Sequence, residues 1–417
     1  MRPETLEILR CPYCGSRLEL VESMHHVREA EAILEGVLAC HCCLFPVVGG
    51  VPVMHLHPNA ALAREAIEAG ESDRAFRALV SEDEERAARF TEAAAGHNTT
   101  YRELAETLAE ELEGDCFLYR FSDPSYVAAS AVVRAVGGTV LANGGRAIDA
   151  CGGSGHLTRV LLELSDAPVI ADLYFAKLWL AARYVAPGCE PVCCDGNAPL
   201  PLARGAFRFA LCADAFMYIW TKRQLVGELE RLVDRGPSEA AAVVITHAHN
   251  QLVWSHSHGE PLPPEGYRDL FESLEPRLFP EQRLLDDVVA GGPLDLSRRS
   301  DAEALAADPA LTIVATRSAG TVGLLRPHPL GAREPLRGDL RLNPLYATER
   351  VGSGLRMRLA FPSEDYEEEY GACRRYLPEE VTLAREVMEA VEEGKRTPQV
   401  RELLRRRIVL DMPERYY

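Results

Sequence analysis

An ordered alternation of apolar runs and helical segments between residues 146 and 250 constrains the fold more than any other feature. Five apolar runs, each short enough to be one strand, are separated by segments whose apolar residues recur at helical spacing. We expect strands within 146–150, 168–173, 190–201, 207–216 and 241–250. Strands that alternate with helices along a chain form parallel sheets with helices on both faces. The sequence therefore predicts an α/β fold.

A polar side chain stands at or near the carboxyl end of each expected strand. In chain order these residues are Asp149, Asp172, Asp195, Asp214 and His247. Sheets of this type bind ligands at that edge. An acid after the second strand suits a ribose diol. An acid after the third can accept a hydrogen bond from an adenine amine. The series predicts a site for an adenine nucleoside.

A glycine-rich turn, Cys-Gly-Gly-Ser-Gly at 151–155, follows the first of these strands. Glycines let the backbone approach a ligand closely and expose the N–H groups of the next helix. A nicotinamide-dinucleotide site would need a third glycine three residues after Gly155, as in the fingerprint G-x-G-x-x-G. His156, Leu157 and Thr158 follow instead. The turn therefore argues against a dinucleotide site.

Two cysteine pairs near the start of the chain, roughly 25 residues apart, have the spacing of metal-binding knuckles. The four residues are Cys11, Cys14, Cys40 and Cys43. Four thiolates on two such turns can converge on one Zn²⁺, which would be structural because the segment has little core of its own. Cys43 preserves the C-x-x-C spacing, while Cys42 and His41 are alternatives for the fourth ligand. Buried or redox-active cysteines are the competing interpretation.

The cysteine pairs lie in segments that resemble a known family. LEILRCPYCGSRLEL and GVLACHCCLFPVVGGVPVM are similar, over residues 5–55, to the small zinc-ribbon activator subunits of tRNA and protein methyltransferases. The chain departs from that family in the insertion HHVREAEAILEG. Because those subunits bind and activate methyltransferases, the resemblance implies that a methyltransferase unit follows in this chain.

Residues 116–327 resemble the class I S-adenosylmethionine-dependent methyltransferases, which have a Rossmann-like sheet. IDACGGSGHLT is similar to their first motif, in which Asp149, Gly153 and Gly155 match and Cys151 replaces a glycine. That replacement is tolerable if the backbone at Cys151 keeps a negative φ. DGNAPLPLARGAF resembles a later motif, although Arg208 stands where the family has an aspartate. The two strand-like runs within 311–327 suit the terminal antiparallel hairpin of that fold.

The resemblance implies S-adenosylmethionine as the cofactor. The implied cofactor-binding residues are Asp149, Cys151, Gly153, Gly155, Asp172, Leu173, Asp195, Gly196, Asn197 and Asp214. It also implies an acceptor pocket beside the fifth strand, where residues 246–272 contain four histidines: His247, His249, His256 and His258. Histidine can act as a base near neutral pH, and we prefer His247 in that role, with Asp214, Tyr218, His249 and Asn250 lining the pocket. A second metal site and a solvated loop are the alternative interpretations of these histidines.

The pattern along the chain divides it into four parts. We expect a zinc ribbon at 1–58, a helical connector at 59–115, the methyltransferase domain at 116–327 and an α+β C-terminal appendage at 328–417. Within the third part, 250–310 exceeds a simple crossover, so we interpret it as an insertion that shapes acceptor specificity.

The charge balance bears on the acceptor. Lys and Arg number 45 against 63 Asp and Glu, which gives a formal net charge of −18 and disfavours nucleic acid. No apolar run reaches the about 18 residues of a membrane span, and the start lacks a signal-peptide pattern, so we expect a cytoplasmic protein without membrane attachment. We expect methyl transfer to an O or N atom of a small molecule. An RNA or protein methyltransferase with a recognition ribbon, and a non-catalytic scaffold, are the alternatives.

Overall fold

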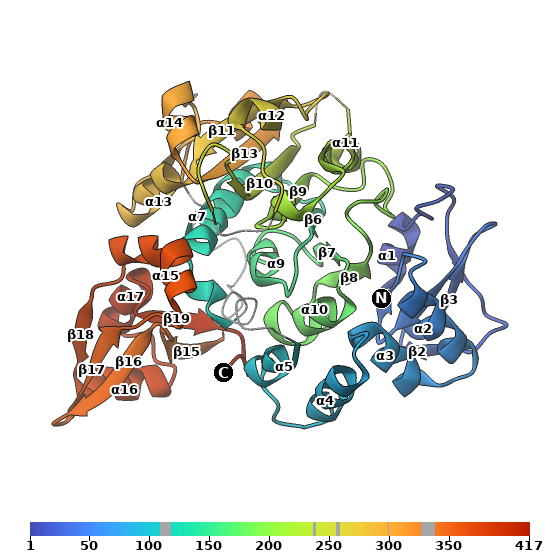
Figure 1. The fold of residues 1–417 in the computed structure, drawn as a ribbon, viewed down its shortest axis with the longest axis horizontal. Helices are drawn as coiled ribbons and strands as arrows, with labels where there is room; N and C mark the ends of the chain where they lie inside the picture. The colour runs from blue at the N-terminus through green and yellow to red at the C-terminus, as the bar shows by residue number, and fades with distance from the viewer. Residues whose placement is uncertain (109–117, 237–238, 256–258, 299, 327–337) are drawn as a thin grey trace.

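The computed structural model describes residues 1–108, 118–236, 239–255, 259–298, 300–326 and 338–417. Figure 1 shows a central sheet flanked by helices, with the N-terminal unit and the C-terminal unit on opposite sides of it. None of the described helices is long and apolar enough to cross a membrane.

The central sheet has seven strands in the order β11-β13-β10-β9-β6-β7-β8. Five of them are mutually parallel: β6 (Ala147–Ala150), β7 (Val169–Asp172), β8 (Glu190–Cys193), β9 (Phe209–Ala213) and β10 (Ala242–His249). These are the five strands that the apolar runs predict. Their order is that of a doubly wound Rossmann sheet, with the chain starting in the middle and moving first to one side and then to the other.

The remaining two strands complete the sheet beyond β10. β13 (Ala310–Thr316) runs antiparallel to β10 and to its other neighbour, β11 (Glu275–Pro280), so β11 is a sixth strand parallel to the five. An antiparallel strand inserted between the fifth and sixth parallel strands is the arrangement of class I methyltransferases. The predicted Rossmann-like α/β fold is therefore confirmed.

The predicted hairpin within 311–327 is wrong. The second strand of that segment, β14 (Leu324–Leu325), pairs with β12 (Leu294–Asp295) in a separate two-stranded sheet. The antiparallel partners of β13 are β10 and β11, and β11 lies inside the segment interpreted as an insertion. β11 carries prolines at its second and last positions, and proline is tolerated there because β11 is an edge strand.

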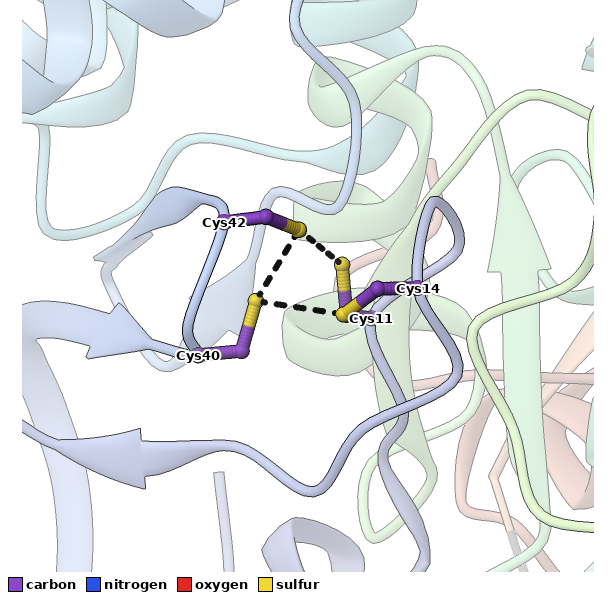
Figure 2. A group of neighbouring side chains, drawn as sticks. All are labelled: Cys11, Cys14, Cys40 and Cys42. Carbon is purple, nitrogen blue, oxygen red and sulfur yellow. Dashed lines mark hydrogen bonds between the residues drawn. The ribbon is translucent and has the colours of Figure 1, made fainter.

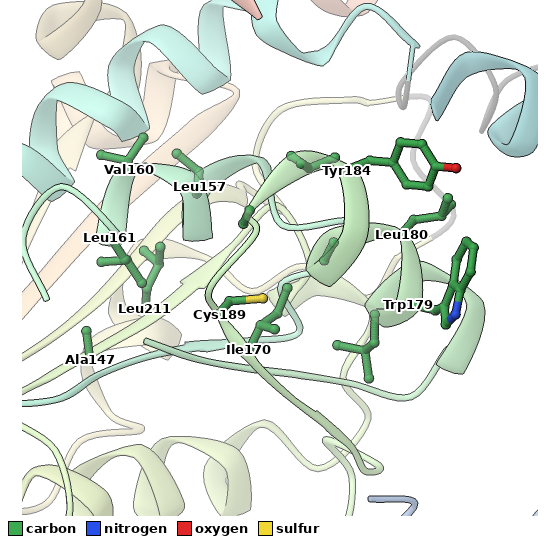
Figure 3. Packing of buried hydrophobic residues seen from close by; sticks show 14 of the residues in the cluster. Ala147, Leu157, Val160, Leu161, Ile170, Trp179, Leu180, Tyr184, Cys189 and Leu211 are labelled. Atoms are coloured by element: carbon green, nitrogen blue, oxygen red, sulfur yellow. The ribbon is translucent and has the colours of Figure 1, made fainter. Parts of the chain in front are cut away.

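Helices cover both faces of the sheet because successive strand residues point to opposite sides. On one face, Ala147 and Ile170 belong to a cluster that includes the inner residues of α9 (His156–Leu161) and α10 (Phe175–Leu180), as Figure 3 shows. On the other face, Ile148 and Val243 pack with α11 (Lys222–Val233). Further helices on the first face are α7 (Pro124–Val132) and α13 (Glu281–Val289).

The N-terminal unit is a small antiparallel sheet that follows the short helix α1 (Pro3–Ile8). Its strands are β1 (Glu19–Leu20), β2 (Val27–Glu29), β3 (Ala32–Ala39), β4 (Leu44–Val48) and β5 (Val51–Pro52). Directly after β5, Val53 forms a parallel bridge with Cys193 of β8, and the Met54 amide donates to the Cys193 carbonyl at 2.6 Å. The N-terminal unit thus covers the outer edge of the central sheet.

Up to Leu108, where the described part of the segment predicted to be helical ends, four helices follow the N-terminal unit. They are α2 (Pro58–Glu68), α3 (Ser72–Val80), α4 (Glu84–Ala94) and α5 (Tyr101–Leu108). Phe76 of α3 and Phe90 of α4 both meet the Trp179 ring of α10 edge-on, at 5.5 and 5.6 Å between ring centroids. These aromatic contacts attach the helices to the central domain.

The C-terminal unit contains both strands and helices, as predicted. Its strands are β15 (Asp339–Leu342), β16 (Tyr346–Val351), β17 (Gly354–Leu359), β18 (Glu380–Leu383) and β19 (Val409–Met412), and its helices are α15 (Glu364–Tyr370), α16 (Arg385–Glu392) and α17 (Pro398–Arg405). Tyr366 of α15 donates to the buried Asp123 carboxylate just before α7. Asn343 accepts from the Ser122 hydroxyl at 3.0 Å. These buried contacts place α15 over the end of the sheet that carries the expected site.

Candidate active site

The glycine-rich turn after β6 is joined to the end of β7 by two hydrogen bonds. The Gly153 amide donates to Oδ2 of Asp172 at 2.9 Å, and the Gly152 amide donates to the Ala171 carbonyl at 3.1 Å. Oδ1 of Asp172 accepts from the Tyr174 amide at 2.9 Å. Asp172 therefore lies against the turn, at the edge where the sequence predicts a nucleoside.

Two glycines of this turn have conformations that explain their identity. Gly153 has φ +55°, and a Cβ built there would meet no atom within 4 Å. Gly155 has φ +85°, and a Cβ there would lie 2.9 Å from the Ala181 Cβ. The turn is consequently open on the side of Gly153 and closely packed at Gly155.

Cys151 does not keep the negative φ that the sequence comparison expects. Its φ is +59°, in the left-handed region that favours glycine. Its Sγ lies 3.1 Å from the Cβ position of Gly196, so these two residues meet behind the turn.

Asp149 is buried under the turn, with 1% of its surface exposed. Its Oδ2 accepts from the Thr158 hydroxyl at 2.6 Å. Burial raises the pKa of Asp149 to about 7. Asp149 thus supports the turn from the protein interior, whereas Gly153 and Asp172 lie on its half-buried side.

The predicted adenine-side residues follow β8. Oδ1 of Asp195 accepts from the Asn197 amide at 2.8 Å. The Asn197 side-chain oxygen accepts from the Trp220 amide at 2.7 Å, which joins this loop to the segment after β9. Leu173, the remaining predicted cofactor residue, accepts from the Cys193 thiol through its carbonyl. The structure brings these residues to the same sheet edge as the glycine-rich turn.

The predicted acceptor residues Asp214, His247 and His249 lie together, the first directly after β9 and the two histidines within β10, at its carboxyl end. One ligating atom from each of the three lies within 4.8 Å of the other two. Nε2 of His247 is 3.8 Å from Oδ1 of Asp214, and the two imidazole rings are 5.0 Å apart at 80°. His247 and Asp214 both have φ +52°, and the pairing of β10 with β13 is irregular between Ile245 and Ala248. This β-bulge turns His247 toward Asp214.

Three charged residues beside this pair of histidines were not predicted from the sequence. Glu281, at the start of α13, accepts from Nδ1 of His247 at 2.7 Å and from the His247 amide at 3.1 Å. Glu369 of α15 places Oε1 3.6 Å from Nε2 of His247 and 3.5 Å from Nε2 of His249. Arg120 forms an ion pair with Oδ2 of Asp214 at 2.7 Å.

The carboxylates split the pKa values of the two histidines. Burial alone would lower the pKa of His247, but Glu281, Asp214 and Glu369 outweigh it and raise that pKa well above the ordinary value. Burial, together with the charge of His247, lowers the pKa of His249. Without a bound cation, His247 therefore carries a proton at neutral pH and His249 does not.

Two other predicted acceptor residues lie on the segments that directly follow β9 and β10. Tyr218 stands in a 3-10 turn, Phe216–Tyr218, with 53% of its surface exposed. Asn250 is buried, and its side-chain amide donates to the Leu305 and Asp308 carbonyls rather than lining a pocket. His256 and His258 lie outside the described residues.

Four cysteines of the N-terminal unit form a compact cluster, drawn in Figure 2. They are Cys11, Cys14, Cys40 and Cys42. Their Sγ atoms lie 3.7 Å apart for Cys11 and Cys42, 3.7 Å for Cys14 and Cys40, and 3.6 Å for Cys40 and Cys42. Four sulfurs around Zn²⁺ at about 2.3 Å would be about 3.8 Å apart, so this cluster fits a structural zinc ion.

The structure places Cys42, and not the preferred Cys43, in this cluster. The second knuckle is closed by the Cys40 amide, which donates to the Cys43 carbonyl at 3.1 Å. Cys43 then leads directly into β4, while Cys42 lies on the turn itself. The Cys43 Sγ lies 3.3 Å from that of Cys42.

Several solved structures are similar to this chain. No family model and no curated protein matches the sequence. Among solved structures, a chain of the complex of the Haloferax volcanii Trm112 methyltransferase activator is 16% identical, with a TM-score of 0.36 over 55% of this chain and 97% of that one. Geranyl diphosphate C-methyltransferase from Streptomyces coelicolor is 15% identical, with a TM-score of 0.31 over 42% of this chain and 71% of that one.

The cyclase SpnF, 16% identical with a TM-score of 0.32 over 46% of this chain and 80% of that one, is a third match. At these identities and TM-scores the likenesses carry no conclusion about activity. The fold rests on the strand order of the central sheet, and the function rests on the site.

Proposed function

We propose that this protein is an S-adenosylmethionine-dependent methyltransferase with a structural zinc ion in its N-terminal unit. The observation that carries the proposal is the contact between the Gly153 amide and Asp172, beside the open face of Gly153. A turn with open space over its backbone and a carboxylate at its rim suits the ribose and amino-acid parts of the cofactor. Asp195 and Gly196 would lie on the adenine side.

The reaction would transfer the methyl group of the sulfonium to an oxygen or nitrogen of the acceptor. A lone pair of the acceptor atom forms the new bond to carbon as the carbon–sulfur bond breaks, and the electron pair of that bond goes to sulfur. The products are the methylated acceptor and S-adenosylhomocysteine, and the proton of the acceptor leaves for a base or solvent. The chain contributes by aligning the two reactants and by managing that proton.

Asp214, His247 and His249 would face the acceptor. Because the raised pKa of His247 keeps it protonated at neutral pH in the absence of a cation, the preference for His247 as a base lacks support from its surroundings. The lowered pKa of His249 leaves its ring neutral and able to accept a proton.

We propose a small-molecule acceptor. Glu369 of the C-terminal unit lies over the two histidines, so the acceptor side is covered by a second folded unit. A site covered in this way suits a small molecule better than an RNA duplex or a folded protein. The net charge of −18 also favours a small molecule over RNA, because an acidic protein has few phosphate contacts to offer.

The proposed cofactor site is tested by titrating the full chain with S-adenosylmethionine in a calorimeter. The wild type should release or absorb heat with a saturable isotherm, and Asp172→Ala should weaken binding by about 10-fold or more, since it removes a hydrogen-bonding charge. Asp269→Ala, an exposed aspartate at the end of the helix Pro264–Arg268, is the matched control. Equal affinity in wild type and Asp172→Ala, or no binding at all, would contradict the proposal.

A further inference from the structure

We propose that Asp214, His247, His249 and Glu369 form a binding site for a divalent transition-metal ion. The site is separate from the cysteine cluster of the N-terminal unit. It lies at the carboxyl edge of β9 and β10, where α15 of the C-terminal unit covers the sheet.

The spacing of the donor atoms fits a metal ion better than hydrogen bonds. Oε1 of Glu369 lies 3.6 Å from Nε2 of His247 and 3.5 Å from Nε2 of His249, and Oδ1 of Asp214 lies 3.8 Å from Nε2 of His247. Hydrogen bonds between such groups would be about 2.7–3.2 Å long. Ligand atoms at about 2.1 Å from a tetrahedral ion would be roughly 3.4 Å apart. The observed separations are close to the edges of a coordination shell.

A buried nitrogen without a partner points into this space. His247 is only 7% exposed, and its Nε2 is buried without a hydrogen-bond partner among the described residues. A buried polar atom left without a partner destabilises the folded protein, so such atoms are rare. A metal ion held by Asp214, His247 and His249, whose ligating atoms lie within 4.8 Å of one another, with Glu369 beside both histidines, would bind this nitrogen.

The outer contacts orient the ligands as in known metal sites. Glu281 accepts from Nδ1 of His247 at 2.7 Å, which leaves Nε2 with its lone pair directed toward the cluster. Arg120 holds the second oxygen of Asp214 at 2.7 Å, and the Ser255 hydroxyl lies 3.3 Å from Nδ1 of His249. A carboxylate behind a ligating histidine is the usual support of a metal–imidazole bond.

The charges favour a cation. The carboxylates of Asp214, Glu281 and Glu369 face the two histidines, and Arg120 is the one guanidinium paired with them in the described part of the chain. Buried charges in proteins are paired or bind metals. Two imidazoles with two carboxylates suit Zn²⁺, Fe²⁺ or Mn²⁺, while Mg²⁺ prefers oxygen alone.

A role for the ion in methyl transfer rests on the proposed function. Bound at the acceptor side, such an ion would hold an acceptor oxygen as a fifth ligand and favour its deprotonated form. An acceptor that offers a hydroxyl or enol oxygen is the substrate class this site would select.

The test uses Mn²⁺ as the probe on the full chain loaded with one equivalent of zinc, because the thiolates bind that zinc and leave the nitrogen and oxygen donors to Mn²⁺. The loss of the free Mn²⁺ signal in electron paramagnetic resonance counts bound ions. The wild type should bind about one Mn²⁺ per chain. Glu369→Gln and His249→Gln should each weaken binding by at least about 10-fold, and Glu281→Gln by about 10- to 100-fold.

The matched control is Glu368→Gln, the exposed neighbour on the same helix, which should bind Mn²⁺ like the wild type. Total zinc, measured by mass spectrometry after equilibration with Zn²⁺, should be about one equivalent higher in the wild type than in Glu369→Gln. The proposal is overturned if neither ion binds beyond the ribbon equivalent. It is also overturned if binding is unchanged in Glu369→Gln and His249→Gln variants that melt like the wild type.

S-adenosylmethionine titrations on the same samples separate this inference from the proposed function. Metal binding without cofactor binding would contradict the methyltransferase proposal and leave the metal site standing. Cofactor binding without the additional metal ion would contradict the metal site and leave the methyltransferase proposal standing.

Discussion

Three residues other than glycine adopt left-handed backbone conformations at the carboxyl edge of neighbouring strands. Cys151 follows β6 with φ +59°, Asp214 follows β9 with φ +52°, and His247 lies near the end of β10 with φ +52°. Such a conformation costs an L-residue roughly 1–2 kcal/mol. Strain of this kind concentrates at functional sites, and here it coincides with the edge where cofactor and acceptor are proposed to meet.

Replacing Cys151 tests the strain directly. Cys151→Gly should be tolerated, because relief of the left-handed strain offsets the higher chain entropy of glycine in the unfolded state. Cys151→Val should destabilise the protein by at least about 1 kcal/mol relative to Cys151→Gly, since a β-branched residue fits that conformation poorly. Urea denaturation of the two variants measures the difference. Equal free energies of unfolding would show that Cys151 is not strained.

His156 should make stability depend on pH. Burial lowers the pKa of His156 to about 3, while an unfolded histidine titrates near 6.5. Because the unfolded chain takes up the proton first, the contribution of this group is intact above pH 6.5 and is lost as the pH falls toward 3. Between pH 7.5 and pH 5, the loss should be about 2 kcal/mol.

The prediction is checked by denaturant unfolding at both pH values. His156→Phe keeps the aromatic contacts with Phe121 and Tyr416 but does not titrate, so its stability should fall by about 2 kcal/mol less than that of the wild type over this range. His97→Phe, at an exposed position, should behave like the wild type. Parallel pH profiles for His156→Phe and the wild type would refute the argument.

At the scale of single elements, the second knuckle shows how a short turn selects a ligand. The hydrogen bond from the Cys40 amide to the Cys43 carbonyl closes the turn, and β4 begins at Leu44. Cys42 lies on the turn between them and joins the other three cysteines. The spacing rule that favours Cys43 does not include the direction in which the chain enters β4.

Zinc analysis of two single variants distinguishes these cysteines. Cys42→Ser should lower the bound zinc to well below the wild-type content, because three thiolates hold the ion more weakly than four. Cys43→Ser should retain wild-type zinc. The reverse result would restore Cys43 as the ligand and contradict the geometry of the cluster.

The five parallel strands could be predicted because each is a short apolar run ending in a polar residue, and the glycine-rich turn follows from its composition. β11 could not be predicted, because the prolines of Glu275–Pro280 argue against a strand and only an edge strand tolerates them. Glu281 and Glu369 were also missed. They reach His247 from α13 and α15, far along the chain, and a lone glutamate on a helix carries no signal of what it will face.

At the scale of the whole molecule, separate units meet around one sheet. The N-terminal unit pairs with its outer edge at Cys193, and the C-terminal unit covers its carboxyl end through Tyr366 and Glu369. The boundaries predicted for the four parts remain predictions. The covered site and the acidic chain together favour a small acceptor.

A gel-shift experiment with bulk tRNA checks this at the level of the intact chain. With a net charge of −18, the protein should not retard tRNA even at low salt, because few phosphate contacts are available to release counterions. A basic tRNA-binding protein serves as the positive control. A shift that weakens steeply with added salt would favour an RNA acceptor over a small molecule.

The pairing of Val53 with Cys193 also has a consequence for solubility. Without the N-terminal unit, β8 would expose a row of unpaired amide and carbonyl groups. A strand of another molecule could pair with them, and such exposed edges nucleate aggregation. If zinc holds that unit together, a chelator would act first on self-association and only later on the central fold. After chelation, light scattering should rise with protein concentration before the helical circular-dichroism signal is lost. That order would show that the metal keeps the β8 edge covered.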